Sequence, residues 1–175
     1  NSIQQARIAK TQYFKNDQKS FLENCVKDIQ SIERKAKKTN MVPCIRLNGT
    51  SDLPFENVKL NGKNLMDTFP HIQFYDYTKS HKRMIKYLNN EMPKNYHLTF
   101  SLSEINLDLA IDVLNRGGNV AMVFTELPTT YKGFKVIDAD KTDLRFTDEV
   151  NTISGLKFKG TKKDKLQAIK DGFVI

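Results

Sequence analysis

The residues best suited to chemistry in this chain form a short polar loop, Asn48-Gly49-Thr50-Ser51-Asp52, after an apolar segment that begins at Pro43. Backbone N–H groups around a glycine can hold an anion, and the Asp52 carboxylate can act as an acid, a base or a metal ligand. An ordinary glycine-containing turn is the alternative interpretation. The loop is a candidate site because it follows an expected strand.

A second candidate segment, Tyr75-Asp76-Tyr77-Thr78-Lys79, combines aromatic rings with a lysine. Tyrosine rings can stack on a nucleobase while the Lys79 ammonium binds a phosphate. The alternative is that both tyrosines line a core and form hydrogen bonds there. The segment therefore indicates either a nucleotide-binding surface or a polar part of the core.

The histidines and aspartates do not form a recognisable metal site. His97 falls on an expected strand, but a lone histidine is more often structural than catalytic, and the other two histidines lack metal-ligand spacing with it. Asp138, Asp140 and Asp143 form a D-x-D-x-x-D pattern without the glycine and glutamate of an EF-hand. Glycine-rich nucleotide motifs and nucleophile-elbow motifs do not occur in the sequence. We assign no metal ligand and no catalytic residue, and whether the protein is an enzyme stays open.

The composition favours a folded protein with a polar surface and anionic partners. At 175 residues and a mean hydropathy of −0.53, the chain can form one domain with a buried core. Lys and Arg outnumber Asp and Glu by 28 to 20, and the resulting net charge of +8 favours polyanions: nucleic acid, nucleotides, acidic partners or anionic membranes. The alternative is that the surplus lysines only keep the protein soluble. No apolar run approaches the ~20 residues that span a bilayer, so we expect no membrane partner.

The two cysteines, Cys25 and Cys44, are too few for a disulfide framework in a chain of this length. Each falls in an apolar pattern, which predicts buried free thiols and a reducing, intracellular environment. Because the chain begins at Asn1 rather than Met, the expected single domain, 1–175, leaves room for a native N-terminal segment before it.

Two helices are expected before the first strand. Residues 4–14 follow the helical period loosely. Ser20 and Glu23 then form an S-x-x-E pattern, which predicts that a longer helix begins with Ser20 as its N-cap.

A βα repeat organises the residues that follow. The four expected strands are 43–48, 72–77, 96–102 and 119–125. The helical segments between them are 65–69, 81–90 and 107–114, with Gly117 placed to end the last. The shorter elements expected after residue 128 are strands at 134–138, 144–146 and 150–158 and a helix at 163–170. This rhythm predicts a parallel sheet with right-handed crossovers.

Side-chain alternation gives the expected sheet one apolar and one polar face. Strand 96–102 places Leu98 and Phe100 on one side and His97, Thr99 and Ser101 on the other. Helices on one side only would curl the sheet and leave its other face as a concave wall. The predicted fold is α/β: a curved, largely parallel (β/α) partial barrel with helices on the convex side and short extra strands at the C-terminus. The alternative is a polar face covered by the C-terminal strands.

The polar concave wall is expected to bind a ligand. Buried polar groups need partners, and Arg46 finds no carboxylate within the strands of that wall, so an anionic ligand or water is its expected partner. The predicted ligand-binding residues are Arg46, Asn48, Thr50, Ser51, Asp52, Tyr75, Tyr77, Lys79, His97 and Ser101.

Several phrases of the sequence resemble the gene product 88 family of phages and mobile elements. They are SIQQARIAKT at 2–11, RLNGTSD at 46–52, FYDYTK at 74–79, NYHLTFS at 95–101, GNVA at 118–121, GFKVID at 133–138 and DLRF at 143–146. The resemblance covers nearly the whole chain and implies a phage or plasmid accessory protein in the cytoplasm of the host cell. It implies no particular activity, because the family has no assigned function.

Longer members of this family carry a cysteine-rich segment upstream of the stretch that matches Ser2. That arrangement is similar to the iron–sulfur loop of radical S-adenosylmethionine enzymes, which are partial (β/α) barrels. The resemblance implies, as an alternative, an enzyme domain in which residues 48–52 hold the cofactor while His97 and Arg46 lie near the substrate. The present chain lacks the upstream cysteines, so we assign no cofactor to it.

Three classes of function remain open at this point. The first is a protein that binds nucleic acid or a nucleotide-like anionic ligand on its polar concave face. The second is the radical S-adenosylmethionine type of enzyme domain without its cluster-binding segment. The third is a protein-interaction module that acts on a host enzyme. The sequence leaves the oligomeric state open.

Overall fold

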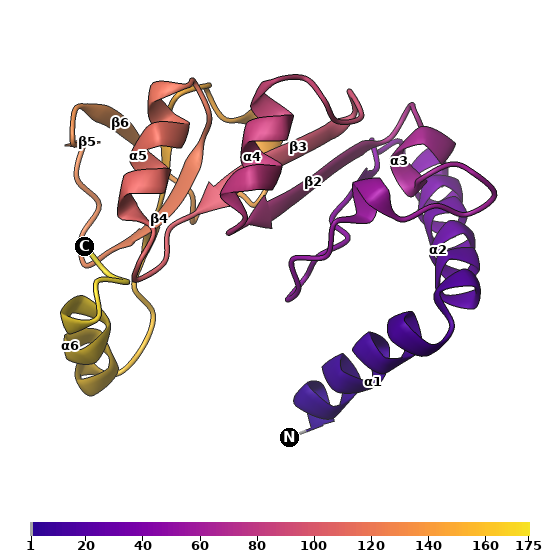
Figure 1. The fold of residues 1–175 in the computed structure, drawn as a ribbon, viewed down its shortest axis with the longest axis horizontal. Coiled ribbons are helices and arrows are strands. Elements are labelled where there is room, and N and C mark those ends of the chain that lie inside the picture. Colours follow the sequence, from indigo (N-terminus) through magenta and orange to yellow (C-terminus); the bar gives the residue numbers. More distant parts are fainter. Residues whose placement is uncertain (1) are drawn as a thin grey trace. The chain divides into compact units, whose positions relative to one another are not determined.

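The computed structural model describes residues 2–175 and shows a mixed α/β protein with a mostly parallel sheet of seven strands (Figure 1). The chain divides into two compact units, the first ending at Phe74 and the second comprising Tyr75–Ile175. The two edge strands of the sheet do not pair with each other, so the sheet is open. The α/β class is confirmed, whereas the expected barrel character is not.

Two helices dominate the first unit. Its elements are α1 (Ser2–Asn16), α2 (Gln18–Lys38), β1 (Cys44–Ile45), the 3₁₀ helix η1 (Phe55–Asn57), α3 (Leu65–Thr68) and the start of β2 (Gln73–Thr78). The buried residues of α2 are Leu22, Ile29 and Ala36, which share one helix face and pack it on the core. β1 pairs in parallel with the first two residues of β2. It ends at Ile45, so the expected strand 43–48 is shorter than predicted.

The start of α2 differs from the sequence prediction. The helix begins at Gln18, and Asp17 is its N-cap, because Asp17 Oδ1 accepts a hydrogen bond from the Ser20 backbone N–H at 3.0 Å. Ser20 therefore lies inside the first turn, and the predicted cap at Ser20 is wrong. Hydrogen bonds from Ser20 also lower the pKa of the Asp17 carboxyl.

Replacing Asp17 by Ala should lower the thermal unfolding midpoint by a few degrees, since a cap carboxylate satisfies an N–H that has no acceptor within the helix. Ser20→Ala is the matched control, because it keeps the backbone N–H that Asp17 binds, and its effect should be smaller. Circular dichroism melting curves measure both midpoints. A larger decrease of the midpoint in Ser20→Ala than in Asp17→Ala would show that Ser20 is the N-cap.

The second unit contains the remaining elements. They are α4 (His81–Leu88), β3 (Tyr96–Ser101), α5 (Leu107–Asn115), β4 (Val120–Phe124), β5 (Thr130–Tyr131), β6 (Phe134–Asp138), the 3₁₀ helix η2 (Arg145–Thr147), β7 (Ile153–Lys157) and α6 (Lys162–Lys170). The strand order of the sheet is β1-β2-β3-β4-β7-β6-β5, with β5 antiparallel to β6. Gly117 follows α5 with a φ of +86°, as its predicted role at the helix end requires. Within residues 2–175, no helix combines the length and apolar composition that crossing a membrane requires.

Helices α4 and α5 lie side by side on one face of the sheet (Figure 1). The strand residues on this face are apolar and buried: Leu98, Phe100, Val120, Met122 and Phe124. His81 of α4 contacts the Phe100 ring and binds the Asp112 carboxylate of α5 at 2.8 Å, which ties the two helices together. The predicted apolar face of strands 96–102 and 119–125 is therefore confirmed.

The connection from β6 to β7 covers the opposite face of the sheet. Strands β1 to β4 occupy neighbouring positions in the sheet in the order of the chain. From β6 to β7 the chain moves across the sheet in the reverse direction, toward β4. A right-handed crossover in the reverse direction must pass over the other face. Accordingly, η2 packs against β3, and the Phe146 ring lies 5.5 Å from the Tyr75 ring. The strand predicted at 144–146 is wrong, since these residues belong to this covering segment, and β5 was not predicted.

The C-terminal tail extends the sheet beside β4. The β3–β4 ladder ends at the pair Ser101↔Ala121, before β4 itself ends. The tail continues along β4, because the Ile175 N–H donates to the Val123 carbonyl at 2.9 Å and the Thr125 N–H donates to the Ile175 carbonyl at 2.8 Å. The carboxyl ends of parallel strands are where α/β folds often bind ligands. At β4 this position is taken by the tail.

Candidate functional site

The polar loop at residues 48–52 is held closed by Asn48, which is 2% exposed. Its Nδ2 donates to the Leu53 carbonyl at 2.9 Å, and its Oδ1 accepts from the Leu53 N–H at 2.9 Å. The Ser51 hydroxyl donates to the same Oδ1 at 2.8 Å. Asn48 and Ser51 therefore fix the shape of the loop, while Gly49 and Thr50 are exposed.

The loop forms one wall of a groove whose other wall is helix α1, and we call it the α1 groove. Its volume is about 830 Å³, within the range of small-ligand sites. The loop contributes Gly49, Thr50 and Ser51, and the helix contributes Arg7, Lys10 and Lys15. The groove thus combines the exposed Thr50 side chain and Gly49 backbone on one side with long cationic side chains on the other.

The charge of the α1 groove has one sign. Arg7, Lys10 and Lys15 are exposed cations, and none of the described residues that line the groove is acidic. The whole helix Ser2–Asn16 contains no Asp or Glu. Cationic donors attract anions and form charge-assisted hydrogen bonds with them. The groove is therefore suited to an anionic ligand.

Aromatic contacts attach the carboxyl end of α1 to the rest of the first unit. The Phe14 ring lies 5.3 Å from the Phe21 ring and 5.7 Å from the Phe55 ring. Asn24 Nδ2 donates to the Tyr13 hydroxyl at 2.8 Å. The helix Ser2–Asn16 contains no buried residue. The aromatic anchor therefore sets the position of a helix whose other side chains are open to a ligand.

Tyr75 and Tyr77 in the second unit share one carboxylate. The Tyr77 hydroxyl donates to Asp143 at 2.9 Å, and the Tyr75 hydroxyl lies 3.4 Å from the other oxygen of Asp143. Tyr75 is buried, whereas Lys79 is exposed. The hydroxyl groups thus have an acceptor within the protein, as in the alternative interpretation of a hydrogen-bonded core. The ligand-binding role of these three residues stays a prediction.

His97 lies between two hydroxyl groups on the polar face of β3. Its Nδ1 is 3.0 Å from the Tyr87 hydroxyl and its Nε2 is 3.4 Å from the Thr99 hydroxyl. Burial, with a smaller contribution from Arg145, lowers the pKa of His97 to about 4. The imidazole is therefore neutral at pH 7. On the same face, Ser101 is half-buried.

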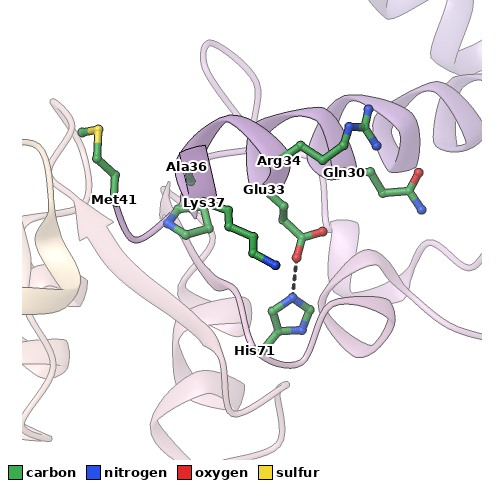
Figure 2. Close-up of a pocket in the computed structure, with 8 residues that line it drawn as sticks. Gln30, Glu33, Arg34, Ala36, Lys37, Met41 and His71 are labelled. Carbon is green, nitrogen blue, oxygen red and sulfur yellow. Dashed lines mark hydrogen bonds and ion pairs between the residues drawn. The ribbon is translucent and has the colours of Figure 1, made fainter. Parts of the chain in front are cut away.

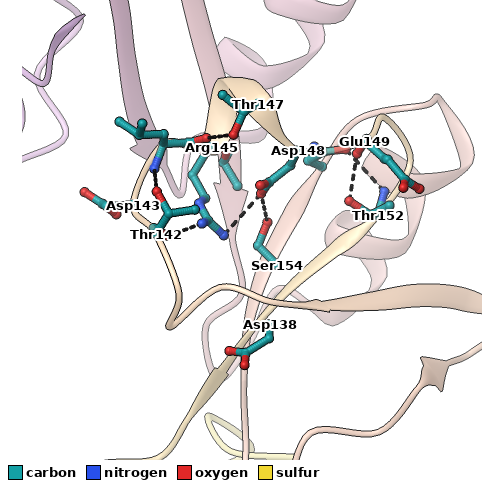
Figure 3. A network of polar contacts seen from close by, with 12 residues as sticks. Asp138, Thr142, Asp143, Arg145, Thr147, Asp148, Glu149, Thr152 and Ser154 are labelled. Carbon is teal, nitrogen blue, oxygen red and sulfur yellow. Dashed lines mark hydrogen bonds and ion pairs between the residues drawn. The ribbon is translucent and has the colours of Figure 1, made fainter. Parts of the chain in front are cut away.

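A buried arginine, Arg145, lies at the centre of the segment that covers this face (Figure 3). Its side chain is 1% exposed, and Nη1 forms an ion pair with Asp148 Oδ2 at 3.1 Å. Nη2 donates to the Thr142 carbonyl, and the Ser154 hydroxyl donates to Asp148 at 3.0 Å. Among the described residues, Arg145 Nε has no hydrogen-bond partner. Sequence reasoning missed this cluster, because Arg145 was assigned to a strand.

A smaller pocket, of about 420 Å³, lies along α2 beside His71 (Figure 2). Arg34 and Lys37 line it together with Glu33. Glu33 Oε1 is 2.5 Å from His71 Nε2, so the carboxylate and the imidazole already bind each other. This pocket carries both signs of charge and is less suited to an anion than the α1 groove.

Metal-binding side chains do not cluster in the described part of the chain. No group of three His, Cys, Asp or Glu within residues 2–175 is arranged to hold a metal ion. Of the D-x-D-x-x-D pattern, Asp140 accepts from Lys159 Nζ at 2.7 Å, and Asp138 accepts from the Asp140 N–H at 3.1 Å. Cys25 is a free, half-buried thiol, and burial raises its pKa to about 11.

The predicted ligand residues divide between the two units. The first unit holds Arg46, Asn48, Thr50, Ser51 and Asp52, and the second holds Tyr75, Tyr77, Lys79, His97 and Ser101. Thr50 and Ser51 line the α1 groove, and Arg46 is exposed beyond the end of β1. The convergence of all ten residues on one wall stays a prediction. Sequence reasoning missed the cations of α1, although the absence of acidic residues from 2–16 was a signal for them.

Comparison with protein families identifies relatives of the chain. The sequence profile described as Gene product 88 matches residues 1–175. The chain belongs to the gene product 88 family. The resemblance stated from the sequence is thus confirmed, while the likeness to radical S-adenosylmethionine enzymes gains no support. Comparison with curated proteins and with solved structures gave no match.

Proposed function

We propose that the protein is a phage or plasmid accessory protein that binds nucleic acid in the α1 groove. The observation that carries the proposal is the presence of three cations, and of no carboxylate among the described lining residues, in a groove of about 830 Å³. On the polar face of the second unit, Tyr75, Tyr77 and His97 already bind protein groups. The α1 groove is therefore the better supported surface.

The spacing of the cations along α1 suits a chain of phosphates. Arg7 and Lys10 lie one helical turn apart, so their side chains are neighbours on the helix surface, and Lys15 extends the charge toward the aromatic anchor. A helix of this length spans about 22 Å, and successive cations along it can contact successive phosphates. The net charge of +8 adds a long-range attraction for the same ligand.

Binding to a labelled oligonucleotide should weaken steeply with added salt, and removing the groove cations should flatten that dependence. Each phosphate contact releases counterions, so the slope of log K against log salt reports the number of contacts. In the variant Arg7→Gln/Lys10→Gln/Lys15→Gln the slope should decrease by about 2 to 3. Fluorescence anisotropy over a salt series measures both slopes.

The matched control removes the same charge from the exposed helix α6. Lys162→Gln/Lys163→Gln/Lys170→Gln changes three exposed lysines and leaves the α1 groove intact. Its salt slope should stay near that of the unchanged protein. Equal decreases of the salt slope in the two variants would show that only net charge matters. An unaltered slope in the α1 variant would show that the groove does not bind the oligonucleotide.

A further inference from the structure

Part of the lining of the α1 groove is apolar and aromatic. Phe14, Phe21 and Phe55 line the groove together with Leu47 and Leu53. Phe55 is buried, whereas Phe14 and Phe21 are only half-buried, so part of their ring surface is accessible from the groove. The groove lining therefore has two kinds of surface: exposed cations and partly buried aromatic rings.

These two surfaces distinguish between forms of nucleic acid. A duplex presents phosphates outward and keeps its bases stacked inside, so the aromatic lining has no counterpart on it. A single strand exposes its bases, and an aromatic ring can stack on any of them. Binding sites for single strands accordingly combine a basic groove for the backbone with aromatic side chains for the bases.

We propose that the α1 groove binds single-stranded nucleic acid, with the phosphates at Arg7, Lys10 and Lys15 and a base against the rings of Phe14 and Phe21. This inference rests on the proposed nucleic-acid function and names the form of its ligand. Electrostatic attraction by the three cations acts on all polyanions. The aromatic rings add a contact that only an unpaired base can make.

The loop wall has room for a ligand opposite the cations. A Cβ atom added at Gly49 would meet no protein atom within 4 Å, so the space beside its backbone is open. The hydrogen bonds of Asn48 hold the loop in this shape. The backbone of Gly49 is thus exposed, and the loop that carries it keeps its conformation without a ligand. A side chain at this position would project into the space that the ligand needs.

Competition between three polyanions tests the inference. A labelled single-stranded DNA is displaced by the unlabelled single strand, by the duplex of the same sequence, or by inorganic polyphosphate of the same charge. The single strand should compete at concentrations about tenfold below the other two, since only it offers unpaired bases. Equal competition by duplex or polyphosphate would overturn the inference, because charge alone would then explain binding.

Two substitutions locate the single strand in the groove. Gly49→Val should leave the thermal midpoint unchanged, because no protein atom lies in the way, and should weaken single-strand binding by about tenfold. Phe14→Leu keeps an apolar side chain and should reduce the preference for single strand over polyphosphate. Unchanged single-strand binding in a folded Gly49→Val protein would overturn the placement. Failure of the underlying function is recognised separately, by an α1 triple variant that binds as tightly as the unchanged protein.

Discussion

Replacing Asp148 by Ala is expected to destabilise the protein by about 3–5 kcal/mol, because it leaves the charge of Arg145 buried without its partner. The Arg145 side chain is 1% exposed and that of Asp148 is 7% exposed, so water does not compensate for the loss. The hydrogen bond from Ser154 to Asp148 is lost as well. Urea denaturation measures the change in the free energy of unfolding.

Glu149, next in the chain, provides the matched control. Its ion pair with Lys135 is exposed on both sides, so Glu149→Ala should cost only about 0–1 kcal/mol. Replacing both members of the buried pair, as Arg145→Met/Asp148→Leu, should recover much of the lost stability, since no unpaired charge remains. Similar losses for Asp148→Ala and Glu149→Ala would show that the Arg145 pair does not hold the covering segment in place.

Acid should destabilise the protein through His97. The ordinary histidine pKa is 6.5, and burial followed by the Arg145 charge lowers it to about 4 in the folded state. As the pH falls from 6.5 to about 4, His97 takes up a proton in the unfolded chain but not in the folded protein. The contribution of His97 to the free energy of unfolding is therefore fully present above pH 6.5 and decreases below it, with a total loss of about 3 kcal/mol.

The variant His97→Gln isolates this contribution, because glutamine does not titrate. The free energy of unfolding of the unchanged protein should fall more steeply with acid than that of His97→Gln, and the difference should develop between pH 6.5 and about 4. Burial raises the pKa of Asp148, whose titration acts in the opposite direction but is common to both proteins. Parallel pH profiles would show that His97 titrates normally in the folded state.

Most elements of the second unit, though not β5 or η2, could be predicted because their signals are local. Alternation identified the apolar face of β3 and β4, and β6 has the predicted bounds, Phe134–Asp138. The segment 144–146 was assigned wrongly because Arg145 lies between two apolar residues, and such alternation is typical of a strand. What places it in η2 is burial against Asp148 and β3, and these partners meet it only after the crossover has formed.

The candidate site was predicted only in part, for a related reason. The polar loop was found from its composition, but the sequence does not show that the side-chain amide of Asn48 is hydrogen-bonded to Leu53 and Ser51. It also does not show that the loop faces α1. The N-cap illustrates the same difficulty at short range: Asp17 and Ser20 both have suitable side chains, and only the backbone geometry selects Asp17.

The pairing of the C-terminal tail with β4 bears on the order of events during protein synthesis. Ile175 supplies the hydrogen bonds that continue along β4, and Val174 forms a parallel bridge with Val123, so this part of the sheet can form only after residues 174 and 175 have emerged from the ribosome. Until then, the nascent chain presents an unpaired strand edge, the kind of surface through which chains associate wrongly. Domains that fold from the N-terminus onward during translation complete most of their contacts early. Here the pairing beside β4 can form only after the other elements of the described chain have been synthesised.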